Sequence, residues 1–359
     1  MKSLEKRRLL IGIAVVGISI ALAGCSTPPS AKSAAASSSY LPCVIADVGG
    51  FNDHSFNQLS LSGVTQAASE LGSSYLKYQS QNADDYSTGI SSLISQKCNL
   101  IVAPGFNFIA SVKSAAISNP KVDFAIIDDN SIHERNVQDI VFETDQAAFL
   151  GGYAAAAYSK TGVVATWGGG EIPPVTLYMD GVADGVRYYD QQTGKHVQLL
   201  GWNESTQKGT FVGNFTDQNS AKSITQNFLD QNADVIIPVA ASLYEGAAAA
   251  IDSSGSDAVI EGVDADLYQT DVKNRHLFLV SILKQVGVAA KAAVLDAAGS
   301  RTFDNTTYIG TLKNGGVGLS SFHDYASKIP STLPAQLAKI AAGIEDGSIT
   351  VASPSSFTK

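Results

Sequence analysis

A group of polar and aromatic residues that could hold a small molecule follows the first apolar run of the folded part of the chain. The run ends at Asp47, and the chain continues Val-Gly-Gly-Phe-Asn-Asp-His-Ser55-Phe56-Asn57-Gln58. The carboxylate of Asp47 can accept hydrogen bonds from a ligand, and the ring of Phe56 can stack on a flat one. The structural alternative is that Ser55 and Gln58 form a capping box at the start of a helix, with Phe56 in its core face.

Two further polar residues follow apolar runs in the same way. Asn107 comes shortly after Leu100–Ala103, and Asp264 comes directly after Val259–Val263. Ligands bind beyond the carboxyl ends of parallel strands, so these residues are candidates for a binding site. Asp128 and Asp129 also follow an apolar run, and the sequence leaves open whether they bind a ligand or only hold a hinge.

Alternation of apolar runs with longer helical patterns indicates an α/β fold. The apolar runs are buried on both faces by their pattern, as parallel strands are, and alternation of this kind gives doubly wound parallel sheets with right-handed crossovers. The predicted strands are 43–47, 75–79, 100–103, 124–127, 140–142, 163–167, 197–202, 235–239, 259–263, 277–282 and 308–311. The predicted helices are 56–71, 86–96, 106–118, 147–159, 176–189, 219–230, 243–254, 285–299 and 333–346.

The length of the chain predicts two lobes. About 320 residues follow the N-terminal segments, which exceeds the usual size of one hydrophobic core. No linker separates two independent halves, so the lobes should share a hinge of crossing strands. We expect an N-terminal lobe of residues 41–145 plus about 270–305, and a C-terminal lobe of residues 146–269 plus about 306–359.

The N-terminus has the pattern of an exported lipoprotein. A basic head precedes the uncharged run Leu9–Ala23, which is short for a membrane span and suits a signal peptide of residues 1–24. The run ends Leu-Ala-Gly-Cys25, which resembles a lipobox and implies acylation of Cys25. Residues 25–40 read as a flexible tether. The prediction is an extracytoplasmic protein anchored to the cell membrane; a simple signal peptide with an incidental Cys25 is the alternative.

Composition and motifs argue against several functions. The net charge of −9 becomes −12 when residues 1–24, which carry +3, are removed, and a surface of this charge argues against nucleic acid as a partner. The five histidines show no metal-binding spacing, and no nucleophile elbow or phosphate-binding loop is present. We therefore expect no enzyme activity, no metal and no cofactor.

Two cysteines remain after Cys25. Cys43 and Cys98 each stand at the start of a predicted strand, and in an oxidising compartment an even pair favours a disulfide. If the two strands are parallel neighbours, both thiols lie at the same edge of the sheet, at a spacing near that of a disulfide. The alternative is two buried free thiols.

An ordered series of motifs resembles the basic membrane protein family, the purine nucleoside receptor lipoproteins of bacterial transporters. The series covers residues 43 to 345. Its members include the Asp-x-Gly-Gly-Phe-Asn-Asp-x-Ser-Phe-Asn-Gln segment from Asp47, and then 124–129, 136–142, 146–157, 167–174, 233–236, 261–266, 281–284 and 312–318. The resemblance implies a type I periplasmic-binding fold and a monomeric receptor that delivers a nucleoside, a purine by preference, to an ABC transporter permease.

The resemblance also implies roles for site residues. Asp47 and Asn107 would contact the base or the adjoining sugar edge, with Asn57 beside them. Phe56 and Phe215 would stack on opposite faces of the base. A carboxylate can accept two hydroxyl donors, so Asp264 would bind the ribose. The resemblance also implies that Lys284 completes the ribose site and balances the charge of Asp264.

Some residues depart from the family pattern. Ala240-Ala241-Ser242 stands where a Gly-Gly pair is usual, and its methyl groups would narrow the approach of a sugar. His54 replaces a lysine, and Leu59 to Gly63 replaces a Trp-Glu pair. Two other functions stay open: a lipoprotein that senses a nucleoside or sugar-like solute, and an enzyme that acts on a sugar or nucleoside.

Overall fold

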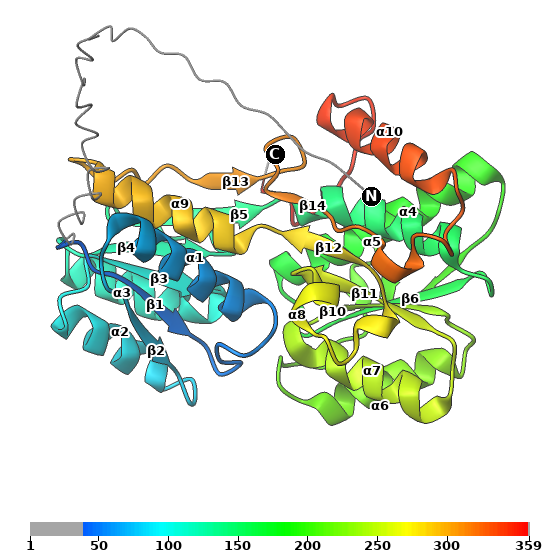
Figure 1. Ribbon diagram of the computed structural model, residues 1–359, viewed down its shortest axis with the longest axis horizontal. Coiled ribbons are helices and arrows are strands. Elements are labelled where there is room, and N and C mark those ends of the chain that lie inside the picture. The colour runs from blue at the N-terminus through cyan, green and yellow to red at the C-terminus, as the bar shows by residue number, and fades with distance from the viewer. Residues whose placement is uncertain (1–38, 358–359) are drawn as a thin grey trace, which may run out of the picture. The chain divides into compact units, whose positions relative to one another are not determined.

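The α/β fold predicted from the sequence is confirmed. The computed structural model describes residues 39–357, and the predicted signal peptide, Cys25 and nearly all of the tether lie outside them. Two six-stranded sheets, each flanked by helices, define an N-terminal and a C-terminal lobe (Figure 1).

The sheet of the N-terminal lobe has the strand order β13-β5-β4-β3-β1-β2, and all of its neighbours are parallel. Its strands are β1 (Pro42–Ala46), β2 (Leu76–Gln79), β3 (Leu100–Pro104), β4 (Asp123–Ile127), β5 (Val137–Phe142) and β13 (Tyr308–Gly310).

The sheet of the C-terminal lobe has the order β14-β12-β11-β10-β6-β7, with only the edge strand β14 antiparallel to its neighbour. Its strands are β6 (Val163–Gly168), β7 (Gln198–Leu200), β10 (Val235–Val239), β11 (Val259–Asp264), β12 (Phe278–Lys284) and β14 (Val317–Leu319). A small hairpin, β8 (Trp202–Asn203) with β9 (Lys208–Gly209), follows β7.

Helices cover both faces of each sheet, mostly as packed pairs. In the N-terminal lobe α1 packs on α9, and α2 on α3; in the C-terminal lobe α4 packs on α5, and α6 on α7 (Figure 1). The α-helices are α1 (Phe56–Leu71), α2 (Asp85–Ser95), α3 (Ile109–Ser118), α4 (Thr144–Tyr158), α5 (Pro173–Thr193), α6 (Gln218–Leu229), α7 (Tyr244–Ser254), α8 (Leu267–Thr270), α9 (Val286–Gly299) and α10 (Leu333–Glu345).

The central strands are continuous apolar runs because helices cover both of their faces. In β1 the alternate residues Val44 and Ala46 belong to the core under α1, whereas Cys43 and Ile45 belong to the core on the other face. All five residues of β1, β3 and β10 are buried. The sequence therefore located these strands within a residue or two.

The predicted strand 197–202 is interrupted in the structure. Gly201 has a φ of 83°, in the left-handed region, and it separates β7 from the β8–β9 hairpin. A side chain at this position would also meet the carbonyl oxygen of Thr166 at 2.0 Å. The turn needs glycine, so the apolar run contains two short strands.

Three segments cross between the lobes, and they place the lobe boundaries differently from the expectation. The crossings run from β5 to α4, from β12 to α9, and from β13 to β14. Residues 278–284 pair with β11 in the C-terminal lobe, and 308–310 pair with β5 in the N-terminal lobe. The second segment of the N-terminal lobe thus runs from about 285 to 310, where 270 to 305 was expected. The difference arises because each crossing occurs at the carboxyl end of a strand.

The structure joins Cys43 and Cys98 in a disulfide. Their Cα atoms lie 5.9 Å apart, within the range for such bonds, and both side chains are buried. Cys43 is in β1, and Cys98 precedes the neighbouring parallel strand β3. The protein from Ser26 onward contains no other cysteine.

Helices α4 and α5 approach each other closely through glycines. A side chain at Gly152 would meet the carbonyl oxygen of Val182 at 2.2 Å, and one at Gly185 would meet that of Phe149 at 2.1 Å. Glycine is therefore required for this backbone contact. The contact fixes α5, which carries a side chain to the cavity described below.

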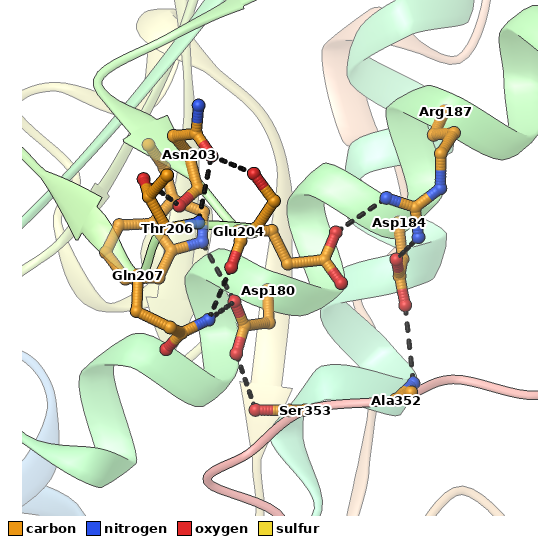
Figure 2. Close-up of polar contacts among 11 residues, drawn as sticks. Asp180, Asp184, Arg187, Asn203, Glu204, Thr206, Gln207, Ala352 and Ser353 are labelled. Atoms are coloured by element: carbon orange, nitrogen blue, oxygen red, sulfur yellow. Dashed lines mark hydrogen bonds and ion pairs between the residues drawn. The ribbon is translucent and has the colours of Figure 1, made fainter.

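Buried carboxylates on α5 also tie this helix to two other segments. Asp180 accepts hydrogen bonds from Trp202 and Gln207 of the hairpin segment and from Ser353 near the C-terminus, while Asp184 bonds to Arg187 and to the backbone N–H of Ala352 (Figure 2). These carboxylates act as junctions between elements that are far apart in the sequence.

A buried carboxyl near the first crossing makes stability depend on pH. Burial, together with the charges of Glu143 and Asp180, raises the pKa of Asp145 to about 7. The pKa of Asp145 is higher in the folded protein than in the unfolded chain. Its contribution to the free energy of unfolding is therefore fully present below about pH 4, where the carboxyl is protonated in both states, and is lost as the pH rises through 7. Asp145→Asn should remove this loss, which is at most about 1.4 kcal/mol per pH unit.

Urea unfolding between pH 4 and 8 checks this prediction. Relative to the parent, Asp145→Asn should gain stability as pH rises, whereas Asp296→Asn, at an exposed position, should not. A constant difference between Asp145→Asn and the parent at every pH would contradict the assignment.

Candidate functional site

The carboxyl ends of strands from both sheets meet at one cavity between the lobes. Its volume is about 740 Å³, including space open to solvent. All seven ligand-binding residues predicted from the sequence line it: Asp47, Phe56, Asn57, Asn107, Phe215, Asp264 and Lys284. Strand polarity explains why Asp47, Asn107 and Asp264 converge, because the carboxyl ends of parallel strands meet at one edge of a sheet.

The loop after β1 is held by Asp53, not by the predicted capping box. The carboxylate of Asp53 accepts backbone hydrogen bonds from Ser55, Asn57 and Gln58 at 2.7–3.0 Å. The Ser55 side chain makes no bond to the helix and instead donates to Asp264 Oδ2 at 2.9 Å. The capping box, which the sequence offered as the structural alternative, does not form. The buried carboxylate of Asp53 supplies the acceptors, and the hydroxyl of Ser55 is free to bond to the other lobe.

Asp47 is the centre of an amide–carboxylate group in the N-terminal lobe. Its Oδ1 accepts from Asn57 Nδ2 at 3.0 Å and from the backbone N–H of Gly49 at 2.9 Å. Its Oδ2 lies 3.4 Å from Asn107 Nδ2. The three side chains therefore present fixed acceptors and donors to the cavity.

Lys284 is buried at the end of β12, with its side chain only 4% exposed. Its ammonium lies 2.6 Å from Asp128 Oδ2 and 3.8 Å from Asp264 Oδ1, and it sits 5.0 Å from the ring centroid of Phe56. Asp128 is thus a partner of Lys284 at the cavity wall, a role that the sequence left open. The pair joins β4 of one lobe to β12 of the other.

Asp264 is held by donors from two directions. Tyr178 of α5 donates its hydroxyl to Oδ1 at 2.9 Å, opposite the bond from Ser55 to Oδ2. Burial and the charge of Asp264 raise the pKa of Tyr178, so that its hydroxyl stays a donor at neutral pH. Sequence reasoning missed Tyr178 because it lies within a helix and not after a strand, and an aromatic residue in a helix is usually a core residue.

Three phenylalanine rings line the cavity. Phe56 belongs to the N-terminal lobe and Phe215 to the C-terminal lobe, as the predicted stacking pair requires. The ring nearest to Phe215 is nevertheless that of Phe106, at a centroid distance of 6.3 Å. Phe106 was not predicted as a site residue, although its place two residues after the end of β3 was a usable signal.

The segment after β10 forms an apolar part of the wall. Ala240, Ala241 and Ser242 all line the cavity, beside Val239 and Val263. Ala241 has a φ of 47°, a left-handed conformation that favours glycine. The methyl groups expected to narrow the cavity therefore lie at its wall.

Within residues 39–357 no cluster of three or more His, Cys, Asp or Glu side chains could hold a metal ion. Over the same residues no helix combines the length and apolar character needed to cross a membrane.

The sequence of residues 42–339 matches the Bmp family, described as ABC transporter substrate-binding protein PnrA-like. The chain belongs to this family. The resemblance stated from the motifs is therefore confirmed, and the chain is a substrate-binding protein of the ABC transporter type.

Relatives in the family align over most of the chain. The ABC transporter nucleoside-binding protein BmpA of Lactococcus lactis is 29% identical over 97% of this chain and 99% of its own length. Basic membrane protein A of Borreliella burgdorferi is 30% identical over 75% of this chain and 76% of its own. A solved ABC transporter solute-binding protein from Aeropyrum pernix superposes with a TM-score of 0.77 at 25% identity, covering 89% of this chain and 94% of that one.

Proposed function

We propose that this substrate-binding protein captures a nucleoside, a purine nucleoside by preference, and delivers it to an ABC transporter permease. The observation that carries the proposal is one cavity that combines aromatic rings from both lobes with carboxylate, amide and ammonium groups at the strand ends. A flat base suits the rings and a sugar suits the carboxylates. The name of the Lactococcus lactis relative supports this choice of ligand.

Within this proposal the seven cavity residues have distinct roles. Phe56 and Phe215 stack on the base, and the group of Asp47, Asn57 and Asn107 bonds to its edge or to the adjoining sugar. Asp264 accepts the ribose hydroxyls, and Lys284 balances its charge. Residues from both lobes contact the ligand only when the cleft is closed, so the ligand favours the closed state that the permease receives.

The N-terminal pattern completes the proposal. Cleavage before Cys25 and acylation of its thiol would anchor the protein outside the cytoplasmic membrane, with the tether leading to the first strand. The receptor works as a monomer, without a cofactor and without catalysis.

Replacing Asp264 tests the sugar assignment. Asp264→Asn keeps the shape of the side chain but removes the charge that strengthens its hydrogen bonds to hydroxyl donors. We expect about a tenfold loss of affinity for ribosides, because a hydrogen bond to a charged group contributes about 1.5–3 kcal/mol. The affinity for free bases should change by less than about twofold. Isothermal titration calorimetry with matched riboside–base pairs measures both.

The control variant is Asp266→Asn. Asp266 lies two residues further on, where its carboxylate pairs with His323 and does not line the cavity. This variant should bind both ligand classes as the parent does. Equal losses for ribosides and bases in Asp264→Asn would refute the ribose assignment.

A further inference from the structure

We propose that Phe106 and Phe215 form an aromatic gate across the cleft, which must part before a ligand can enter or leave the cavity. The inference rests on the proposed function, because it concerns the same cavity. It assigns Phe106 a role in the exchange of the ligand that differs from the stacking and hydrogen-bonding roles above.

The two rings come from opposite lobes and are in contact. Phe106 follows β3 of the N-terminal lobe, and Phe215 lies in the loop before α6 of the C-terminal lobe. Their centroids are 6.3 Å apart and their planes are tilted by 53°. For a planar ring to pass between two other rings, those two rings must be about 7 Å apart, which is twice the usual carbon–carbon contact distance. At their present separation Phe106 and Phe215 therefore leave no room for a base to pass between them.

The gate is on the side of the cavity away from the hinge. The lobes are joined at the β13–β5 edge of one sheet and the β14–β12 edge of the other. Asp128 and Lys284, at the ends of β4 and β12, are near these edges. Phe106 follows β3, one strand further out, while Phe215 packs against the end of β6, three strands from β12. Both rings are half-buried, whereas Lys284 is almost fully covered.

Both rings are mounted on fixed backbone. Phe215 lies against Gly169, where any side chain would meet its ring at 2.3 Å, and its loop is bonded to the end of β6 through Gly213 N–H to Gly169 O at 2.8 Å. On the other side, Gly105 N–H donates to Ile127 O at 2.9 Å, and the short turn after it carries Phe106. The contact therefore opens through motion of the lobes or rotation of a ring, not through a loose loop.

A buried cysteine behind the gate can report its opening without any ligand. Val263 lines the cavity and is only 3% exposed, and Val263→Cys would be the one free thiol of the protein from Ser26 onward if Cys43 and Cys98 stay oxidised. The rate of its reaction with N-ethylmaleimide measures access to the cavity. In this background Phe106→Ala should raise the rate at least fivefold, and Phe215→Ala should act in the same direction.

Phe303→Ala is the matched control, because Phe303 is a half-buried phenylalanine that does not line the cavity. Its rate should stay within twofold of the background. Equal rates for Phe106→Ala and the background, or an equal rise in Phe303→Ala, would overturn the gate. Adding nucleosides to the background protein tests the proposed function separately: failure of every nucleoside to protect the thiol contradicts nucleoside capture, while the comparison of rates still decides the gate.

Discussion

Lys284→Met is expected to lower the free energy of unfolding by about 3–5 kcal/mol, because removing one partner of a buried ion pair leaves an uncompensated charge. The ammonium lies 2.6 Å from Asp128 and 3.8 Å from Asp264, and its side chain is 4% exposed. Methionine keeps the length of the side chain but leaves the two carboxylates without a cation. Chemical unfolding of the ligand-free protein measures the loss.

The double variant Lys284→Met with Asp128→Asn is the control for this prediction. It removes one of the two stranded charges, so it should recover at least half of the lost stability. Nucleoside binding should stay weak in it, because the charge beside Asp264 is still missing. A single variant as stable as the parent would show that the pair contributes nothing to the closed fold.

Phe56→Ala is expected to weaken nucleoside binding by at least tenfold while the protein stays folded. Loss of one stacked base–aromatic contact costs about 1–3 kcal/mol. The centroid of the ring also lies 5.0 Å from the Lys284 ammonium, so removing the ring removes a cation–π contact of Lys284. Calorimetric titration gives the change in affinity, and thermal unfolding checks the fold.

Two further substitutions of Phe56 distinguish the effect of aromatic stacking from the effect of side-chain volume. Phe56→Tyr retains an aromatic face and should bind within about threefold of the parent. Phe56→Leu fills much of the space without a π-face, so it should resemble Phe56→Ala. Unchanged affinity in Phe56→Ala would remove Phe56 from the stacking pair and contradict the two-ring stacking of the base.

Residues that follow strands could be placed in the cavity from the sequence alone. The runs that became β1, β3 and β11 are apolar on both faces, and parallel strands bring their carboxyl ends to one edge. Asp47, Asn107 and Asp264 were therefore brought together without knowledge of any distance. The resemblance added Phe215, which no strand end indicates.

The partners that hold the site residues could not be predicted. The bond from Ser55 to Asp264 joins residues 209 positions apart, and Tyr178 bonds to Asp264 from the second turn of α5. Such contacts depend on how the two lobes close, which no local pattern records. The absence of the capping box has the same kind of cause. The backbone N–H groups at the start of α1 bond to the carboxylate of Asp53, and this carboxylate is brought there only when the loop folds.

The lobe boundaries show a similar limit. The alternation of strands and helices does not indicate which of the two sheets contains a strand late in the chain. In the structure, residues 278–284 pair with β11 in the C-terminal sheet before the chain crosses to the other lobe. Lys284 stands at this crossing, so the same feature that displaced the predicted boundary also places its ammonium between the lobes.

Thermal shift of the protein from Ser26 onward, against a panel of nucleosides, free bases and sugars, tests nucleoside capture most directly. A ligand that binds only the folded state raises the unfolding temperature, and at a fixed ligand concentration the rise is larger for a tighter ligand. We predict that purine nucleosides produce the largest shifts, with free bases and ribose producing smaller ones at equal concentration. A shift with a sugar and none with any nucleoside would contradict the proposed function.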